Sequence, residues 1–110
     1  MEIIEERQEA THIFHLHGRL DSHTASQLED RLQGSLHGQT RSLIIDCSDL
    51  EYVSSAGLRV ILKATKEMQR QEGRLILCAM QDYVREVFDV SGFSTFIPIV
   101  PGVTEALRTL

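Results

Sequence analysis

Basic residues are scarce in this sequence, which has 11 Lys and Arg against 16 Asp and Glu in 110 residues. The formal net charge of −5 argues against an electrostatic hold on nucleic acid or on anionic lipid. The sequence also lacks any apolar run of the roughly 20 residues that a membrane span needs. Residues 1–6 have no basic segment typical of a secretion signal. We therefore expect a cytoplasmic protein with no membrane partner and no direct nucleic-acid partner.

Cysteine is equally sparse, since Cys47 and Cys78 are the only two and no C-x-x-C motif is present. Both lie near the ends of successive predicted strands, so a redox pair is conceivable. Two small buried side chains in a reducing compartment are the simpler interpretation. The chain is long enough to form a core as a single domain, residues 1–110, without disulfides or metal.

Motifs of several enzyme classes are missing. There is no phosphate loop or dinucleotide fingerprint, and residues 54–57 (SSAG) do not match the G-x-S-x-G nucleophile motif. His15 and His17 share one face of a predicted strand, but a metal site needs a third ligand and only His23 is nearby. Solvated histidines explain this pattern as well. We expect no catalytic residues, no cofactor and no bound metal.

Hydrophobic periodicity predicts strands alternating with helices in the order ββαβαβαβα. The predicted strands are residues 3–7, 11–18, 43–46, 75–78 and 96–100. The first predicted helix is capped by Asp21 or Ser22 and ends at Gly38, and the second begins at the serines at 54–55 and ends near Arg70. The third contains Val84 and ends before Ser91-Gly92, and the fourth begins at Pro101. Charges on the first strand and Pro98 in the last one indicate edge positions.

This order predicts an α/β fold in which the sheet is parallel except for an opening antiparallel hairpin. In the second strand, Phe14 and Leu16 face one side of the sheet. We assign His12 to the opposite side with Ile13, His15 and His17, although its spacing matches that of Phe14. A flavodoxin-like sheet remains compatible with this element order.

The segment from Asp46 to Leu62, DCSDLEYVSSAGLRVIL, is the most informative part of the chain. A strand is expected to run into Asp46, followed by a polar turn at residues 47–49 and then a helix. A serine at such a corner lies beside unpaired amides and the positive end of the helix dipole, which suits a phosphate. The ordinary role of Ser55 would be a helix cap without any regulatory function.

Asp21 and Asp46 each follow a strand, and the two strands are expected to be neighbours, so both carboxylates could lie near Ser55. Paired carboxylates there could bind a metal or act as acid and base, as in phospho-accepting receiver domains. The chain lacks the adjacent acidic pair that a receiver needs after its first parallel strand. Capping and turn formation by these side chains is therefore the preferred interpretation.

Several residues of this segment match a known motif: Asp46, Ser48, Tyr52, Ser55, Gly57 and Leu58. They resemble the D-x-S-x-x-x-(aromatic)-x-D-S-S-G-L segment of STAS-domain anti-sigma factor antagonists. Residues 18–21 and 84–96 also resemble parts of that family, so the resemblance covers nearly the whole chain. The family's Asp and second Ser are replaced here by Ser54 and Ala56.

The resemblance implies a STAS-like β-α superhelix with a mixed, mostly parallel sheet. It also implies that an anti-sigma factor with serine kinase activity phosphorylates Ser55, with Ser54 as second choice, and that a serine phosphatase reverses this. The implied partner-binding residues are Asp21, Ser54, Ser55, Ala56, Gly57 and Arg59. The alternative is a structural STAS module of a signalling scaffold or transporter complex, without a phosphorylation switch.

The charged residues on the helix after Ser55 form a solvated face in the simplest interpretation: Arg59, Lys63, Lys66 and Glu67. Arg59 and Lys63 lie one helical turn apart near Ser55. These two side chains could therefore also contact acidic residues of a partner.

Overall fold

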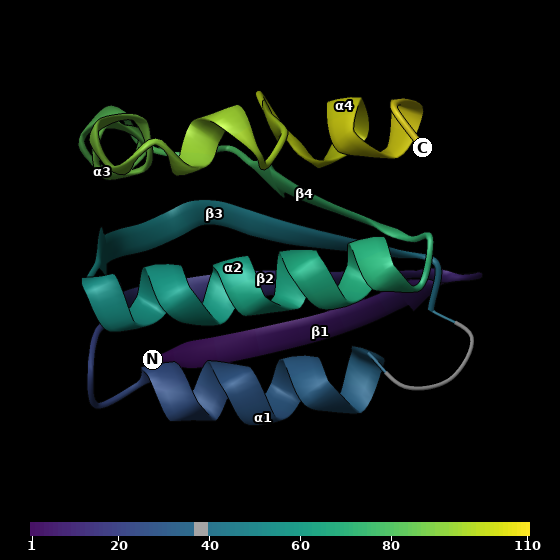
Figure 1. Ribbon diagram of the computed structural model, residues 1–110, viewed down its shortest axis with the longest axis horizontal. Coiled ribbons are helices and arrows are strands. Elements are labelled where there is room, and N and C mark those ends of the chain that lie inside the picture. The colour runs from purple at the N-terminus through teal and green to yellow at the C-terminus, as the bar shows by residue number, and fades with distance from the viewer. Residues whose placement is uncertain (37–39) are drawn as a thin grey trace.

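The computed structural model describes residues 1–36 and 40–110, and within them five strands form one sheet in the order β1-β2-β3-β4-β5 (Figure 1). The strands are β1 (Glu2–Gln8), β2 (Thr11–Leu20), β3 (Ser42–Val53), β4 (Arg74–Cys78) and β5 (Ile99–Val100). The helices are α1 (Ala25–Leu36), α2 (Ser55–Arg70), α3 (Asp82–Ser91) and α4 (Val103–Arg108), with a 3-10 turn η1 (Phe93–Thr95) before β5. β1 pairs antiparallel with β2 and all other pairs are parallel, which confirms the predicted α/β order and mixed sheet.

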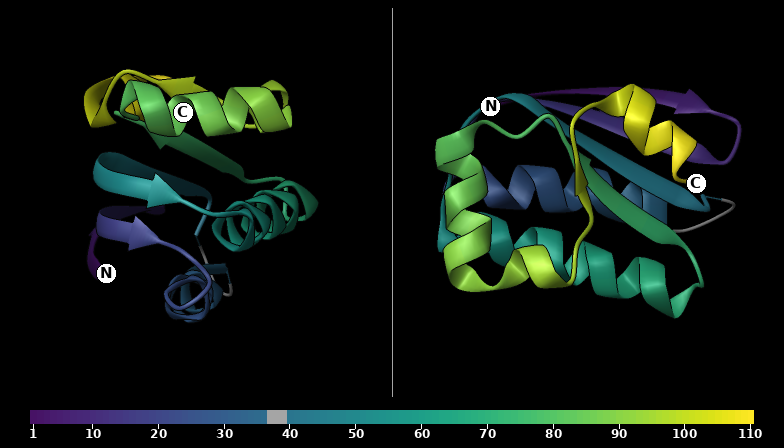
Figure 2. Two further views of the ribbon diagram at one scale, coloured as in Figure 1. Left: turned by 90° about the vertical axis from the view of Figure 1, so that its left-hand side faces the viewer. Right: turned by 90° about the horizontal axis from the view of Figure 1, so that it is seen from above.

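Helices α1 and α2 lie side by side against one face of the sheet (Figures 1 and 2). Their apolar stripes pack with alternate residues of the strands, such as Phe14 and Ile45, and α3 adds Phe88 to the same core. Helix α4 packs on the opposite face, over a smaller cluster: Ile13, Ile44, Ile76, Cys78 and Ala106. β3 and β4 are therefore buried on both faces near α4, as continuous apolar runs in central parallel strands predict.

Strand β3 continues to Val53, so the predicted polar turn at residues 47–49 is wrong. Its pairing with β2 shifts by one residue between His15 and His17 and again between Gly18 and Arg19, so β3 holds one extra residue at each place. These bulges reset the alternation of side chains. Cys47, Leu50 and Val53 consequently all point into the larger core although they are not two residues apart.

The assignment of His12 to the face opposite Phe14 is also wrong. The ring centroids of His12 and Phe14 lie 4.6 Å apart, and the imidazole is hydrogen-bonded to Ser35 of α1. Strict alternation along β2 therefore holds at this position, because Ser35 on α1 and Glu5 on β1 satisfy the polar ring.

The chain after α3 differs from its prediction. β5 is two residues long because residues 96–98, which follow η1, form a turn and bend rather than the first part of the predicted strand. Pro98 precedes β5, which lies at the sheet edge as predicted, and its carbonyl accepts a hydrogen bond from Leu77 N at 2.9 Å. Helix α4 begins at Val103 rather than Pro101, and α3 includes Ser91 before Gly92 ends it at φ 84°.

The predicted end of the first helix at Gly38 lies outside the described residues. In residues 1–36 and 40–110, no helix is long and apolar enough to cross a membrane.

Candidate functional site

Two adjacent serines begin α2 at the carboxyl end of β3, and their side chains have different surroundings. Ser54 is the N-cap, with extended backbone angles (φ −97°, ψ 174°), and its hydroxyl accepts a hydrogen bond from Gly57 N at 3.3 Å. Ser55 is the first helical residue and is exposed. The cap is therefore Ser54, so the ordinary role of Ser55 as the helix cap is wrong, and Ser55 lies exposed at the helix N-terminus.

Asp21 lies next to this helix start, as expected from neighbouring parallel strands. Leu20 pairs with Val53 at the ends of β2 and β3, and the Leu20 carbonyl accepts a hydrogen bond from Ser54 N at 2.8 Å. The Asp21 side chain in turn accepts hydrogen bonds from His23 N at 2.9 Å and Thr24 N at 3.1 Å.

These bonds organise the turn that leads into α1. The hydrogen bond from His23 N, together with those from Thr24, lowers the pKa of Asp21 below its ordinary value. Asp21 therefore presents a carboxylate at neutral pH, and its turn-forming role agrees with the preferred interpretation of the sequence.

Three further residues that the resemblance implied lie in the first turns of α2. Arg59 is exposed and Ala56 is half-buried. Gly57 is buried, contrary to its expected place on a surface patch, and a Cβ there would lie 2.6 Å from Leu20 Cγ. Its lack of a side chain allows α2 to pack closely on the end of β2, which makes it a packing residue.

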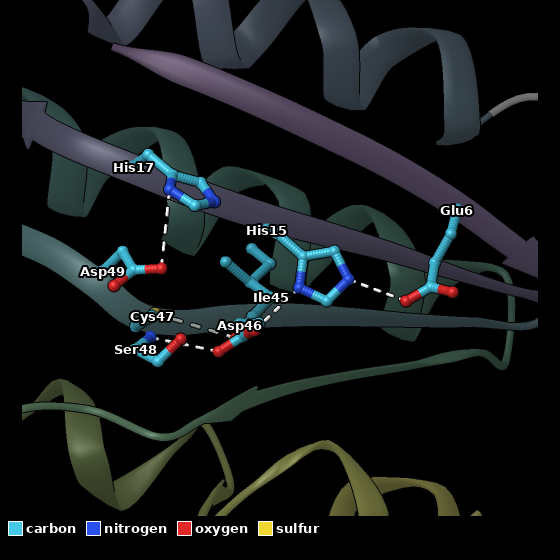
Figure 3. Close-up of polar contacts among 8 residues, drawn as sticks. All are labelled: Glu6, His15, His17, Ile45, Asp46, Cys47, Ser48 and Asp49. Carbon is cyan, nitrogen blue, oxygen red and sulfur yellow. Dashed lines mark hydrogen bonds and ion pairs between the residues drawn. The ribbon is translucent and has the colours of Figure 1, made fainter.

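Asp46 does not lie near Ser55, because β3 runs on for seven residues after it, about 23 Å at the usual rise. Its Oδ2 lies 2.7 Å from Nδ1 of His15, whose Nε2 lies 2.7 Å from Oε1 of Glu6 (Figure 3). Ser48 N also donates to the Asp46 carboxylate, at 3.0 Å. The expectation that Asp21 and Asp46 could both lie near Ser55 is therefore wrong for Asp46.

The protonation of this cluster follows from its contacts. Burial opposes the charge of His15, but hydrogen bonds with Glu6 and Asp46 outweigh it, so the pKa of His15 is raised. Burial likewise opposes the charge of Asp46, but hydrogen bonds from His15 and Ser48 outweigh it and lower the pKa of Asp46. His15 therefore keeps its proton to a higher pH than a free imidazole, and in its protonated form it links β1, β2 and β3.

The same face of β2 carries two further pairs with β3. His17 Nδ1 lies 3.4 Å from Asp49 Oδ2 (Figure 3), and the guanidinium carbon of Arg19 lies 4.2 Å from the centroid of the Tyr52 ring. These pairs were not predicted from the sequence. The alternation of His15 and His17 indicated a shared face, but Arg19 lay beyond the predicted strand and the bulged register that sets these partners was not visible.

The chemistry available at these residues is limited. In the part of the chain that the structure describes, no three His, Cys, Asp or Glu side chains group so as to hold a metal ion. Cys47 and Cys78 are buried free thiols on opposite faces of the sheet. Burial raises the pKa of the Cys78 thiol to about 12 and also raises that of Cys47.

Known proteins resemble this chain in sequence and in fold. The family model described as STAS domain matches residues 2–106. A Bordetella bronchiseptica protein, BtrV, described as a candidate anti-sigma factor antagonist, is 40% identical over 84 residues, which cover 76% of this chain and 72% of that protein. The anti-sigma F factor antagonist of Paenibacillus polymyxa is 27% identical over 99 residues, 89% of this chain and 85% of that protein.

Solved structures show the same fold. The unphosphorylated anti-sigma factor antagonist SpoIIAA is 24% identical and superimposes with a TM-score of 0.86, over 98% of this chain and 95% of that one. Its phosphorylated form from Bacillus has a TM-score of 0.78 at the same identity, over 98% of both chains. By its sequence and its fold, this chain belongs to the STAS domain family, among the anti-sigma factor antagonists.

Proposed function

We propose that this protein is a partner-switching regulator of transcription that catalyses no reaction of its own. Its unphosphorylated form binds an anti-sigma factor with serine kinase activity, in the cytoplasm where sigma factors act, and so releases a sigma factor. Phosphorylation of Ser55 ends this binding, and a serine phosphatase restores it. The docking patch comprises Asp21, Ser54, Ser55, Ala56 and Arg59 around the start of α2.

The observation that carries this proposal is the exposure of Ser55 as the first residue of α2. Ser54 is the less favourable site of phosphorylation because its hydroxyl already forms the capping hydrogen bond with Gly57 N. The family resemblance places an Asp at that position, and Ser and Asp are both strong N-caps. The replacement therefore keeps the cap while removing a carboxylate beside the acceptor serine.

The switch acts on the partner rather than on the fold. A phosphoserine adds roughly −1.5 to −2 charges at neutral pH. At a helix N-terminus this charge is favourable by about 0.3–1 kcal/mol, so the domain stays folded. Inside a docked interface, however, the same charge must be desolvated or displaced, which costs several kcal/mol when it has no partner.

The experiment combines phosphopeptide mapping with calorimetry, using the cognate kinase and ATP. We expect phosphate on Ser55, tight binding by the wild type and Ser55→Ala, and lost binding by Ser55→Glu at an unchanged thermal midpoint. Asp21→Ala tests the patch, and Arg108→Ala on the exposed end of α4 is the control.

The competing function is a structural STAS module in which these serines serve only to start the helix. An intact complex after phosphorylation of Ser55, or no phosphate on either serine, would favour that module. Phosphate on Ser54 alone would move the switch by one residue.

A further inference from the structure

Helix α2 carries positive charge in an acidic chain. It holds Arg59, Lys63, Lys66 and Arg70 but only one acidic residue, Glu67. With four of the 11 basic and one of the 16 acidic residues, α2 has a formal charge of +3, and the remaining residues have −8. Such a separation creates a local positive potential that attracts an acidic partner in one orientation.

The four cations are exposed, and their spacing of four, three and four residues places them along one outer face of α2. We call this row the basic stripe. Lys63 lies 2.8 Å from Glu29, and Arg70 pairs with Glu67. Arg59 and Lys66 form no ion pair with any residue in 1–36 or 40–110. Two cations of the stripe are thus available to a partner.

An apolar hollow of about 330 Å³ adjoins the basic stripe. Its lining comprises Leu62, Thr65, Lys66, Gln69 and Phe96. The Phe96 side chain is 60% exposed, and Leu62 is half-buried. An exposed aromatic ring beside a hollow is a typical anchor position for an apolar side chain of a binding partner.

We propose that the anti-sigma factor extends along α2, placing acidic residues against Arg59 and Lys66 and an apolar side chain in the hollow. This inference rests on the proposed function, because a kinase that reaches Ser55 must already cover the start of α2. An interface of standard size buries about 800 Å² per partner, equivalent to a disc of about 16 Å radius. Along the helix axis, Lys66 lies about 16 Å from Ser55 and Arg70 about 22 Å. An interface of this size centred on Ser55 therefore includes the basic stripe as far as Lys66.

An acidic protein surface fits these features better than a lipid surface. The hollow is a confined space suited to an apolar side chain, whereas a bilayer would contact a broad face, and the remaining charge of −8 repels anionic headgroups. An acidic protein that docks on α2 contacts the basic stripe and not the acidic remainder of the surface. Its association should therefore be fast at low salt and slow as salt rises.

The test measures association and dissociation rates of the unphosphorylated protein with its anti-sigma factor between about 50 and 500 mM NaCl. Charge-reversal variants are Arg59→Glu and Lys66→Glu. Arg108→Glu on α4, which packs on the opposite face of the sheet, makes the same change in net charge and is the matched control. Phe96→Ala tests the hollow, and circular dichroism checks that each variant is folded.

We expect Arg59→Glu and Lys66→Glu to slow association by about tenfold at low salt and to weaken its salt dependence, with less than about twofold change in Arg108→Glu. Phe96→Ala should accelerate dissociation by about fivefold or more. A Lys66→Glu variant that associates like Arg108→Glu would overturn the stripe while leaving the proposed function intact, whereas an unaffected Arg59→Glu would also remove Arg59 from the docking patch. A wild type that binds no anti-sigma factor would overturn both, and binding to anionic vesicles in its place would assign the stripe to lipid.

Discussion

Ser54 and Ser55 are neighbours in the sequence, but of their two side-chain hydroxyls the one that caps the start of α2 is that of Ser54. We expect Ser54→Ala to lower the free energy of unfolding by about 1 kcal/mol, because Gly57 N loses its acceptor. Ser55→Ala should change it by less than about 0.5 kcal/mol, since Ser55 is exposed. Urea unfolding followed by circular dichroism measures both values. A larger loss in Ser55→Ala would show that the two hydroxyls are assigned in the wrong order.

Gly57 provides a second prediction at the scale of single residues. An added Cβ would lie 2.6 Å from Leu20 Cγ and 3.1 Å from Val53 Cγ2, both in the core. Overpacking of this kind costs about 1–3 kcal/mol, against a gain of about 1 kcal/mol in helix propensity, so Gly57→Ala should be destabilising.

Gly34 is the matched control for this substitution. It also lies in a helix, but an added Cβ there would meet nothing within 4 Å. Gly34→Ala should therefore stabilise the protein by about 0.5–1 kcal/mol. If both alanine variants shift the urea midpoint in the same direction, the packing argument for Gly57 fails.

At the scale of elements, His15 links three strands through its contacts with Glu6 on β1 and Asp46 on β3. The raised pKa of His15 means that its stabilising effect is complete below the ordinary value of 6.5 and is lost as pH rises through the folded value. The lowered pKa of Asp46 means that its effect is present above 3.8 and is lost as pH falls through the folded value. The link is therefore strongest between these two pH values.

We accordingly expect the wild type to exceed His15→Gln in stability by about 1 kcal/mol near pH 5.5, and by less near pH 8.5. Urea titrations of both proteins across this range measure the difference. His17→Gln is the control, because His17 lies 3.4 Å from an Asp49 side chain that is 62% exposed. Its effect should remain below about 0.5 kcal/mol. A constant difference between wild type and His15→Gln would contradict the charged link.

At the scale of the whole molecule, the reactivity of each of the two cysteines measures the opening of a different hydrophobic core. Cys78 lies under α4, a helix of six residues, whereas Cys47 lies in the larger core with α1 and α2. Small peripheral elements open at lower free energy than the global unfolding reaction. We expect a thiol reagent in dilute denaturant to modify Cys78 before Cys47, as measured by peptide mass spectrometry. Equal rates at all denaturant concentrations would mean that both thiols are exposed only by global unfolding.

The order of elements was predictable because it depends on local pattern. The runs 43–45 and 75–78 are apolar enough to be central strands, and α2 has a clear stripe from Leu58 to Ile61 and onward. The meeting of Asp21 with the start of α2 was predictable for a related reason. Adjacent parallel strands end at the same edge of a sheet, so the residues that follow them must be neighbours.

The bulges of β3 and the roles of Ser54, Ser55 and Gly57 were decided only by tertiary packing. Hydrophobic alternation does not show where a strand takes in an extra residue, so Asp46 was placed at the sheet edge although it lies within β3. Likewise, which serine caps α2 depends on where the first helical amides point. The local sequence specifies a small polar corner, and the neighbouring strand determines which of its atoms remain at the surface.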